Sequence, residues 1–179
     1  MKNYFFLVLF ITFSSLISSQ NNRIKGKIIK NFGETFDVKN VDIKTDITKE
    51  FKVIFDVSTS SKKTNVINKN IVTAARFLNM HANAGMKPEQ LKVAITIHGG
   101  AWKDVLNDDA YFKRYGVKNP NSLLIKELKN AGVDIIICGQ TASYREIDKK
   151  VILPEVKFAL SAMTALLQYQ NIGYTFIKF

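Results

Sequence analysis

The apolar and polar positions of the chain follow two spacings, one typical of buried strands and the other typical of amphipathic helices. Four short, mostly apolar runs predict strands, at residues 51–57, 92–97, 133–137 and 174–177. The third run, Val-Asp-Ile-Ile-Ile, is too uniformly apolar for a strand with one face in water. We therefore expect it to be a central, parallel strand.

Helical spacing fills the intervals between these strands. It predicts one helix within residues 65–85, polar helical sequence up to Tyr115, a second helix within 120–132 and a short helical stretch over 138–147. We also expect a long helix over 154–169, opened by a proline. The apolar face of this last helix would consist of Val156, Ala159, Leu160, Met163, Leu166 and Leu167.

Strands that alternate with helices are typical of an open α/β sheet. We expect residues 51–179 to form a three-layer α/β/α domain around a mostly parallel sheet of about five strands. The length of 179 residues and the apolar fraction of 46% suit one domain of this size. In such sheets ligands bind at the carboxyl ends of the strands.

The first 50 residues do not follow this alternation. A basic residue, an apolar run over 4–11 and a small polar stretch over 14–19 have the order of a secretory signal peptide. We expect residues 1–19 to be cleaved, which would leave no stable membrane anchor and place the mature chain in a periplasm or outside the cell. An uncleaved anchor is the alternative. Residues 20–50 are predicted to be an arm, either extended or folded as a hairpin around Gly33.

The formal net charge is +11, but charge alone does not predict a nucleic-acid-binding protein. The lysines are scattered, and neither an interleaved aromatic run nor a nucleic-acid motif accompanies them. We expect a lysine-rich solvated surface and no nucleic-acid partner. An anionic envelope surface is the weaker alternative.

The only cysteine, Cys138, ends the predicted third strand and opens a helical stretch. Backbone N–H groups and the helix dipole would favour a thiolate there, and Arg145, one or two turns on, would add positive charge. A small buried hydrophobe and intermolecular pairing are the competing interpretations. In an oxidising compartment a single cysteine excludes an intrachain disulfide framework.

Two other predicted strand ends carry polar groups, His98-Gly99-Gly100 and the serine-rich run over 58–61. The histidine loop is similar to the oxyanion loop of lipase-like hydrolases, but the G-x-S-x-G nucleophile turn is absent. A metal site from His98, Cys138 and His81 would match no compact zinc pattern. The stretch over 58–64 lacks the glycine of a phosphate loop, so helix capping by Thr64 or Asn65 explains it better. We expect no metal and no cofactor.

Four strings in the second part of the chain carry a family resemblance, at residues 75–81, 92–101, 133–140 and 153–165. In this order they resemble the DsrE/DsrF-like family of sulfur-relay proteins, in particular its secreted branch. The resemblance covers most of residues 51–179 and leaves out the predicted signal peptide and arm.

The resemblance implies a cysteine that accepts sulfur as a persulfide and passes it to a partner protein, in subunits that assemble into rings. Cys138 matches the position of that cysteine, and Arg145 matches an arginine on the short helix that follows it. Glu146 departs from the family's pattern, in which a glycine commonly stands at this position. Its side chain places an acid near the thiol.

These observations lead to one hypothesis and one alternative. The hypothesis is a secreted sulfur carrier that holds sulfane sulfur on Cys138, with His98 and Arg145 beside the thiolate, acting as a sulfurtransferase or persulfide carrier rather than as a turnover enzyme. Its partners would be sulfur donor and acceptor proteins or small sulfur species, and the chain would form a homo-oligomer. The alternative is a non-enzymatic binding or assembly module whose cysteine is structural.

Overall fold

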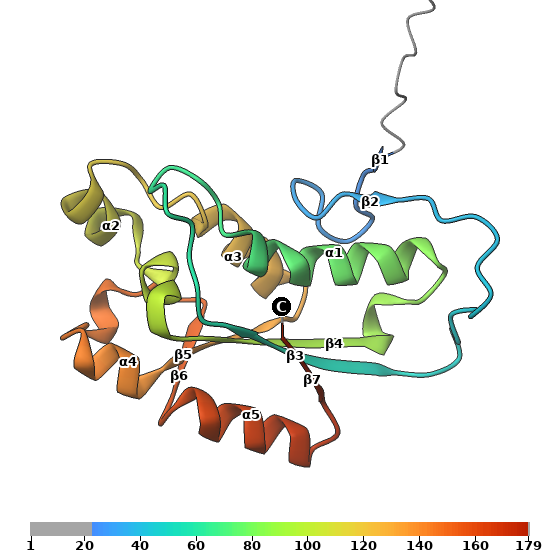
Figure 1. Cartoon of the computed structure of the whole chain (residues 1–179). Coiled ribbons are helices and arrows are strands. Elements are labelled where there is room, and N and C mark those ends of the chain that lie inside the picture. The colour runs from blue at the N-terminus through green and yellow to red at the C-terminus, as the bar shows by residue number, and fades with distance from the viewer. Residues whose placement is uncertain (1–22, 179) are drawn as a thin grey trace, which may run out of the picture.

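The computed structural model describes residues 23–178, so the predicted signal peptide lies outside the described residues. Five parallel strands form the central sheet in the order β6-β5-β4-β3-β7 (Figure 1). Their bounds are Phe51–Val57 for β3, Leu91–Ile97 for β4, Asp134–Cys138 for β5, Val156–Ala159 for β6 and Thr175–Lys178 for β7. The mostly parallel sheet of about five strands is confirmed.

Helices cover both faces of this sheet, which confirms the α/β/α layers. Helices α1 and α3 pack on one face and α5 on the other, while α2 and α4 lie beyond the carboxyl ends of the strands (Figure 1). None of the helices within residues 23–178 is long and apolar enough to cross a membrane. The bounds are Lys69–Asn83 for α1, Asp108–Tyr115 for α2, Ser122–Asn130 for α3, Gly139–Tyr144 for α4 and Ala162–Asn171 for α5. Three 3₁₀ segments complete the set, η1 at Pro88–Gln90, η2 at Gly99–Val105 and η3 at Lys149–Val151.

The two faces of the sheet bury different kinds of side chain. The face under α1 and α3 carries an apolar core, because alternate residues of each strand point to the same side. The opposite face, under α5, carries buried Asp56 and Thr96 beside Ile54, Ala94 and Ile136, and it ends at Cys138. Helix α5 covers that face with small residues, Ala162 and Ala165. The strand residues of the apolar core are Val53, Phe55, Val57, Leu91, Val93, Ile95, Ile97, Ile135, Ile137 and Val156.

The structure corrects the long helix predicted over residues 154–169. Residues 156–159 form the edge strand β6, which pairs with β5 from Val156↔Ile135 to Cys138↔Ala159. Helix α5 begins only at Ala162, where Ser161 accepts the backbone N–H of Thr164 as the N-cap. Pairing with β5 outweighs the helical spacing because it satisfies backbone groups along the edge of the sheet.

Residues 23–36 fold onto the outer side of α1 rather than onto the sheet. Two-residue strands β1 (Arg23–Ile24) and β2 (Thr35–Phe36) pair antiparallel, and Gly33 between them has a left-handed φ of 71°. The side chain of Asn79 in α1, which has no exposed surface, holds the loop between these strands. Its Oδ1 accepts the N–H groups of Ile28 and Ile29, and its Nδ2 donates to three carbonyl groups of the loop. This part of the arm is therefore an integral part of the fold.

Candidate functional site

Cys138 lies at the carboxyl end of β5 and is the N-cap of α4. Its side chain is buried, with 6% of the residue surface exposed. The sulfur accepts the backbone N–H of Thr141 at 3.5 Å. The Thr141 hydroxyl and the backbone N–H groups of Gln140 and Ala162 also act on the sulfur and lower its pKa. All of them are donor groups, and donors around one atom stabilise negative charge on sulfur.

The pKa of the Cys138 thiol reflects a competition between burial and these donors. Burial raises the pKa, because the charged form loses its hydration. The hydrogen bonds from the side chain and backbone of Thr141, and from the backbone of Ala162 and Gln140, lower it, and together they outweigh burial. The pKa is therefore lowered from its ordinary value, which increases the thiolate fraction near neutral pH.

Gly139 allows the chain after β6 to come close to this sulfur. A Cβ atom at position 139 would lie 2.6 Å from the carbonyl oxygen of Ala159 and 3.1 Å from that of Leu160. Both are backbone atoms, which cannot move aside cheaply. The absence of a side chain at Gly139 thus lets the Ala162 N–H reach the thiol.

His98 lies beside Cys138 in the sheet, but its ring faces another partner. The β4–β5 ladder ends at Ile97↔Ile137, so the next residues on each strand are neighbours at the carboxyl edge. The His98 ring nitrogen Nε2 lies 2.8 Å from Oδ1 of Asp56, a buried carboxylate that also pairs with Lys178 at 3.1 Å. No hydrogen bond joins His98 to Cys138 within the described part of the chain.

The loops after β3, β4 and β5 meet, as the sequence predicts for the ends of parallel strands. Gly100 donates its N–H to the carbonyl of Ser58 at 2.8 Å. Gly99 donates its N–H to the hydroxyl of Thr141 at 3.3 Å. Thr141 therefore links the histidine loop to the cysteine, because its own N–H and hydroxyl both contact Sγ of Cys138.

Arg145 lies at the other end of α4, as its C-cap, and no hydrogen bond within residues 23–178 joins it to Cys138. It lies over the rings of Trp102 and Tyr144, at 5.9 and 5.3 Å from their centroids. Glu146, which follows, has a left-handed φ of 53°. Its N–H bonds the carbonyl of Ser143, in the motif that usually ends with glycine. Backbone conformation thus favours a glycine at this position.

A buried polar cluster behind the strand ends was missed by the sequence analysis. Asp104 is 1% exposed, and its carboxylate accepts Ser60 at 2.7 Å, Asn68 at 2.7 Å and Asn121 at 3.2 Å. Burial raises the pKa of Asp104, and these donors oppose that effect. Asn68 is also the N-cap of α1, so the cluster fixes the loop after β3 to this helix. In the sequence, the asparagines that flank the predicted helices were the features that could have indicated this cluster.

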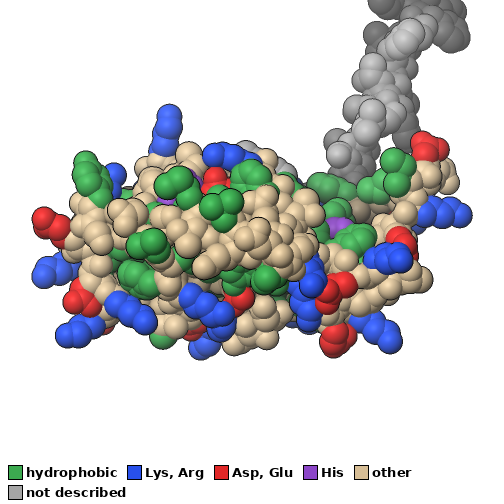
Figure 2. Space-filling view, turned by 90° about the horizontal axis from the view of Figure 1, so that it is seen from below, with side chains coloured by type: hydrophobic (Ala, Val, Ile, Leu, Met, Phe, Trp, Pro, Cys, Tyr) green, Lys and Arg blue, Asp and Glu red, His purple; other side chains and the backbone are tan. Residues whose placement is uncertain are grey.

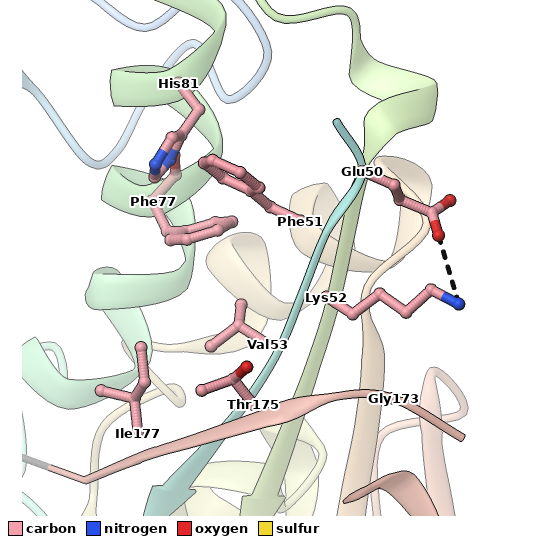
Figure 3. A pocket seen from close by; sticks show the side chains of 9 residues that line it. All are labelled: Glu50, Phe51, Lys52, Val53, Phe77, His81, Gly173, Thr175 and Ile177. Carbon is pink, nitrogen blue, oxygen red and sulfur yellow. Dashed lines mark hydrogen bonds and ion pairs between the residues drawn. The ribbon is translucent and has the colours of Figure 1, made fainter. Parts of the chain in front are cut away.

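A cavity of about 500 Å³ lies at the opposite edge of the sheet, beside the amino ends of β3 and β7. Figure 3 shows the rings of Phe51, Phe77 and His81 gathered on one side of it and an ion pair, Glu50 with Lys52, on the other. His81 donates Nδ1–H to the Phe77 carbonyl at 2.8 Å. His81 is thus far from Cys138, and within residues 23–178 no group of three His, Cys, Asp or Glu side chains could hold a metal ion.

Comparison with known proteins agrees with this architecture. Two solved structures match the fold: MTH1491 from Methanobacterium thermoautotrophicum, a protein of unknown function, and the ychN protein from E. coli. The first has 15% identity and a TM-score of 0.55, and it covers 73% of this chain and 100% of its own. The second has 13% identity and a TM-score of 0.53, and it covers 72% of this chain and 99% of its own.

These two structures support the fold alone, because their sequence identity is low. No curated protein matches the chain. The sequence model of the DsrE/DsrF-like family matches residues 52–179, which include all five strands of the sheet except the first residue of β3. The chain therefore belongs to the DsrE/DsrF-like family.

Proposed function

We propose that this protein carries sulfane sulfur as a persulfide on Cys138. The observation that carries the proposal is the set of donors around the sulfur, from Gln140, Thr141 and Ala162, which lowers the pKa of the thiol despite burial. Membership of a family generally linked to sulfur relay supports the same chemistry.

The proposed loading step needs no oxidant beyond the sulfur donor itself. The Cys138 thiolate attacks a sulfur atom of an inorganic polysulfide, one S–S bond of the polysulfide breaks, and a new S–S bond forms on the protein. The shortened polysulfide leaves with the electron pair of the broken bond. The terminal sulfur of the persulfide then carries the negative charge, and the N–H groups that favour the thiolate would favour this anion too.

Secretion and self-association are part of the same proposal. The apolar run over residues 4–11 supports export to a periplasm, where donor and acceptor would be small sulfur species or other exported proteins. Leu160, Met163 and Leu167 support a homo-oligomer, since they are 71%, 72% and 62% exposed. Seen from the α5 side, Figure 2 shows hydrophobic side chains at the surface with lysines and arginines around the rim.

Intact-mass spectrometry after exposure to sodium polysulfide tests the proposal. We expect the protein to gain the mass of one or more sulfur atoms, and to lose that mass on reduction with dithiothreitol. The Cys138→Ser chain is the matched control and should gain none. A wild-type chain that gains no sulfur, and whose thiol is inert to mild alkylation, would contradict the proposal.

A structural cysteine in a binding or assembly module is the second candidate, because Cys138 is only 6% exposed. This alternative predicts that polysulfide leaves the native chain unmodified and modifies it only after unfolding in urea. It also predicts that replacing the thiol costs stability without changing any chemistry. Mass spectrometry with and without urea separates the two candidates.

A further inference from the structure

Several cationic side chains lie over aromatic rings near the carboxyl ends of the strands. The guanidinium carbons of Arg114 and Arg145 lie 5.2 and 5.9 Å from the centroid of the same ring, that of Trp102. Arg114 is at the end of α2 and Arg145 is the C-cap of α4, so two separate elements bring their charges to one indole. Trp102 itself, in η2, is 9% exposed.

The same surface continues on both sides of Trp102. Lys103 Nζ lies 5.7 Å from the centroid of the Tyr115 ring and donates to the carbonyl of Ser61 at 3.0 Å. Tyr144, over which Arg145 lies, is 79% exposed. We name this surface the cation–aromatic cluster, which consists of Trp102, Lys103, Arg114, Tyr115, Tyr144 and Arg145.

The two arginines of the cluster have no ion-pair partner within residues 23–178, whereas Lys103 lies in the field of the buried Asp104 carboxylate. No ion pair within residues 23–178 includes Lys103, Arg114 or Arg145. Burial and the field of Asp104 raise the pKa of Tyr115, and the fields of Arg114 and Arg145 oppose this rise. The two arginines lie over one indole ring and repel each other, so an added anion would relieve the repulsion.

The composition and exposure of the cluster favour a protein segment as the anion. Arginine, tryptophan and tyrosine are the residues that dominate binding energy at protein interfaces. Arg114 and Arg145 are exposed, and Tyr144 under Arg145 is 79% exposed, so the surface is open and carries aromatic area as well as charge. A flexible chain with carboxylate side chains can satisfy several such cations at once.

We propose that the cation–aromatic cluster docks an acidic segment of a partner protein. Cys138 and Arg145 cap the two ends of α4, so one short helix, roughly 10 Å long, separates the thiol from the cluster. Resting on the proposed function, this placement makes the docked partner the one that delivers sulfur to Cys138 or removes it.

A fluorescein-labelled deca-glutamate peptide tests the docking surface on the full chain. Trp102 is the only tryptophan, so its intrinsic fluorescence reports on the cluster itself, and anisotropy of the label reports on binding overall. We expect the peptide to change the Trp102 emission and to bind at least tenfold more weakly to the Lys103→Gln/Arg114→Gln chain. Arg114→Gln alone, at an exposed side chain, should weaken binding in the same direction.

The matched control removes the same charge elsewhere. Lys25 and Lys30 are exposed on the arm, and the Lys25→Gln/Lys30→Gln chain should lose less than twofold in affinity. Equal losses in the two double variants would mean that only the overall charge matters, and would overturn the proposal. Binding to anionic lipid vesicles or to polyuridylate that exceeds peptide binding and depends on the same two residues would overturn it as well.

The sulfur assay separates failure of this inference from failure of the proposed function. Lys103→Gln/Arg114→Gln should load sulfur from polysulfide as the wild type does, because neither side chain contacts Cys138. If the chain binds the peptide through the cluster but loads no sulfur, only the proposed function is contradicted. Normal sulfur loading without such binding would contradict the docking surface alone.

Discussion

The buried side chains of Asn79 and Cys138 each interact with several backbone groups, but their roles differ. The amide of Asn79 both accepts and donates, with two N–H groups on its oxygen and three carbonyls on its nitrogen. The sulfur of Cys138 only accepts, from Gln140, Thr141 and Ala162. A neutral amide that both donates and accepts hydrogen bonds can hold a loop in place. Several donors around one thiol instead stabilise its thiolate form. Surroundings that both donate and accept hydrogen bonds therefore indicate a structural role, whereas surroundings that only donate them indicate a reactive thiol.

The largest effect should come from removing the amide. Asn79→Ala leaves five backbone groups of the arm without their partner, and we expect a loss of about 3 kcal/mol in the free energy of unfolding. Urea denaturation measures this loss, and limited proteolysis should cut residues 23–36 sooner. Asn130→Ala, at an exposed asparagine at the end of α3, is the control and should cost less than about 0.5 kcal/mol. Equal costs would show that Asn79 does not hold the arm.

Gly139→Ala should affect both stability and the thiol. The added Cβ would lie 2.6 Å from the Ala159 carbonyl oxygen, so the chain must move apart there, at a cost of about 2 kcal/mol. The Ala162 N–H then withdraws from Sγ, and the pKa of Cys138 should rise. Gly100→Ala is the control, because its Cβ would make only a 3.4 Å contact with the Ser58 carbonyl oxygen. A stable Gly139→Ala chain with an unchanged thiol pKa would contradict the close approach.

Glu146→Gly should stabilise the chain. Residue 146 is in the left-handed region, where a side chain is strained and glycine is not, and we expect a gain of about 1 kcal/mol in thermal or urea unfolding. Because residue 146 follows the far end of α4, the pKa of Cys138 should stay the same. A shift in that pKa would mean that the Glu146 carboxylate acts on the thiol through space.

Cys138→Ser should change stability least. A serine hydroxyl can accept the Thr141 N–H in the same N-cap position, so we expect a cost below about 1 kcal/mol at pH 6. The folded chain lowers the pKa of the thiol, so the thiolate stabilises the fold above the unfolded pKa and loses this contribution as the pH falls through the folded pKa. The stability difference between the two chains should therefore grow from pH 6 to pH 9. A difference independent of pH would contradict a thiolate-stabilising site.

The sequence predicted well those elements whose apolar pattern is compatible with only one type of secondary structure. The strands over 51–57, 92–97 and 133–137 are buried within a parallel sheet, so continuous apolar runs identify them. The segment over 156–159 was predicted wrongly as helix, because a short strand at the edge of the sheet can share the spacing of the helix that follows it. Only its pairing with β5 decides between the two, and pairing is not a local property.

The candidate site shows the same limit. Placing Cys138 at a strand end needed only the apolar run and the residue after it. The N–H of Ala162 and the orientation of Arg145 depend on how distant segments pack, and no spacing in the chain encodes them. Asn79 and Asp104 were missed for a related reason, since a polar residue on a predicted helix or loop is usually exposed.

The pH dependence of alkylation at Cys138 tests the central claim most directly. We predict that the rate of modification by iodoacetamide in the native chain has its midpoint below the ordinary pKa of a cysteine thiol. Thr141→Val, which removes one donor to the sulfur, should raise that midpoint. A native midpoint at or above the ordinary value, unchanged by Thr141→Val, would contradict the account.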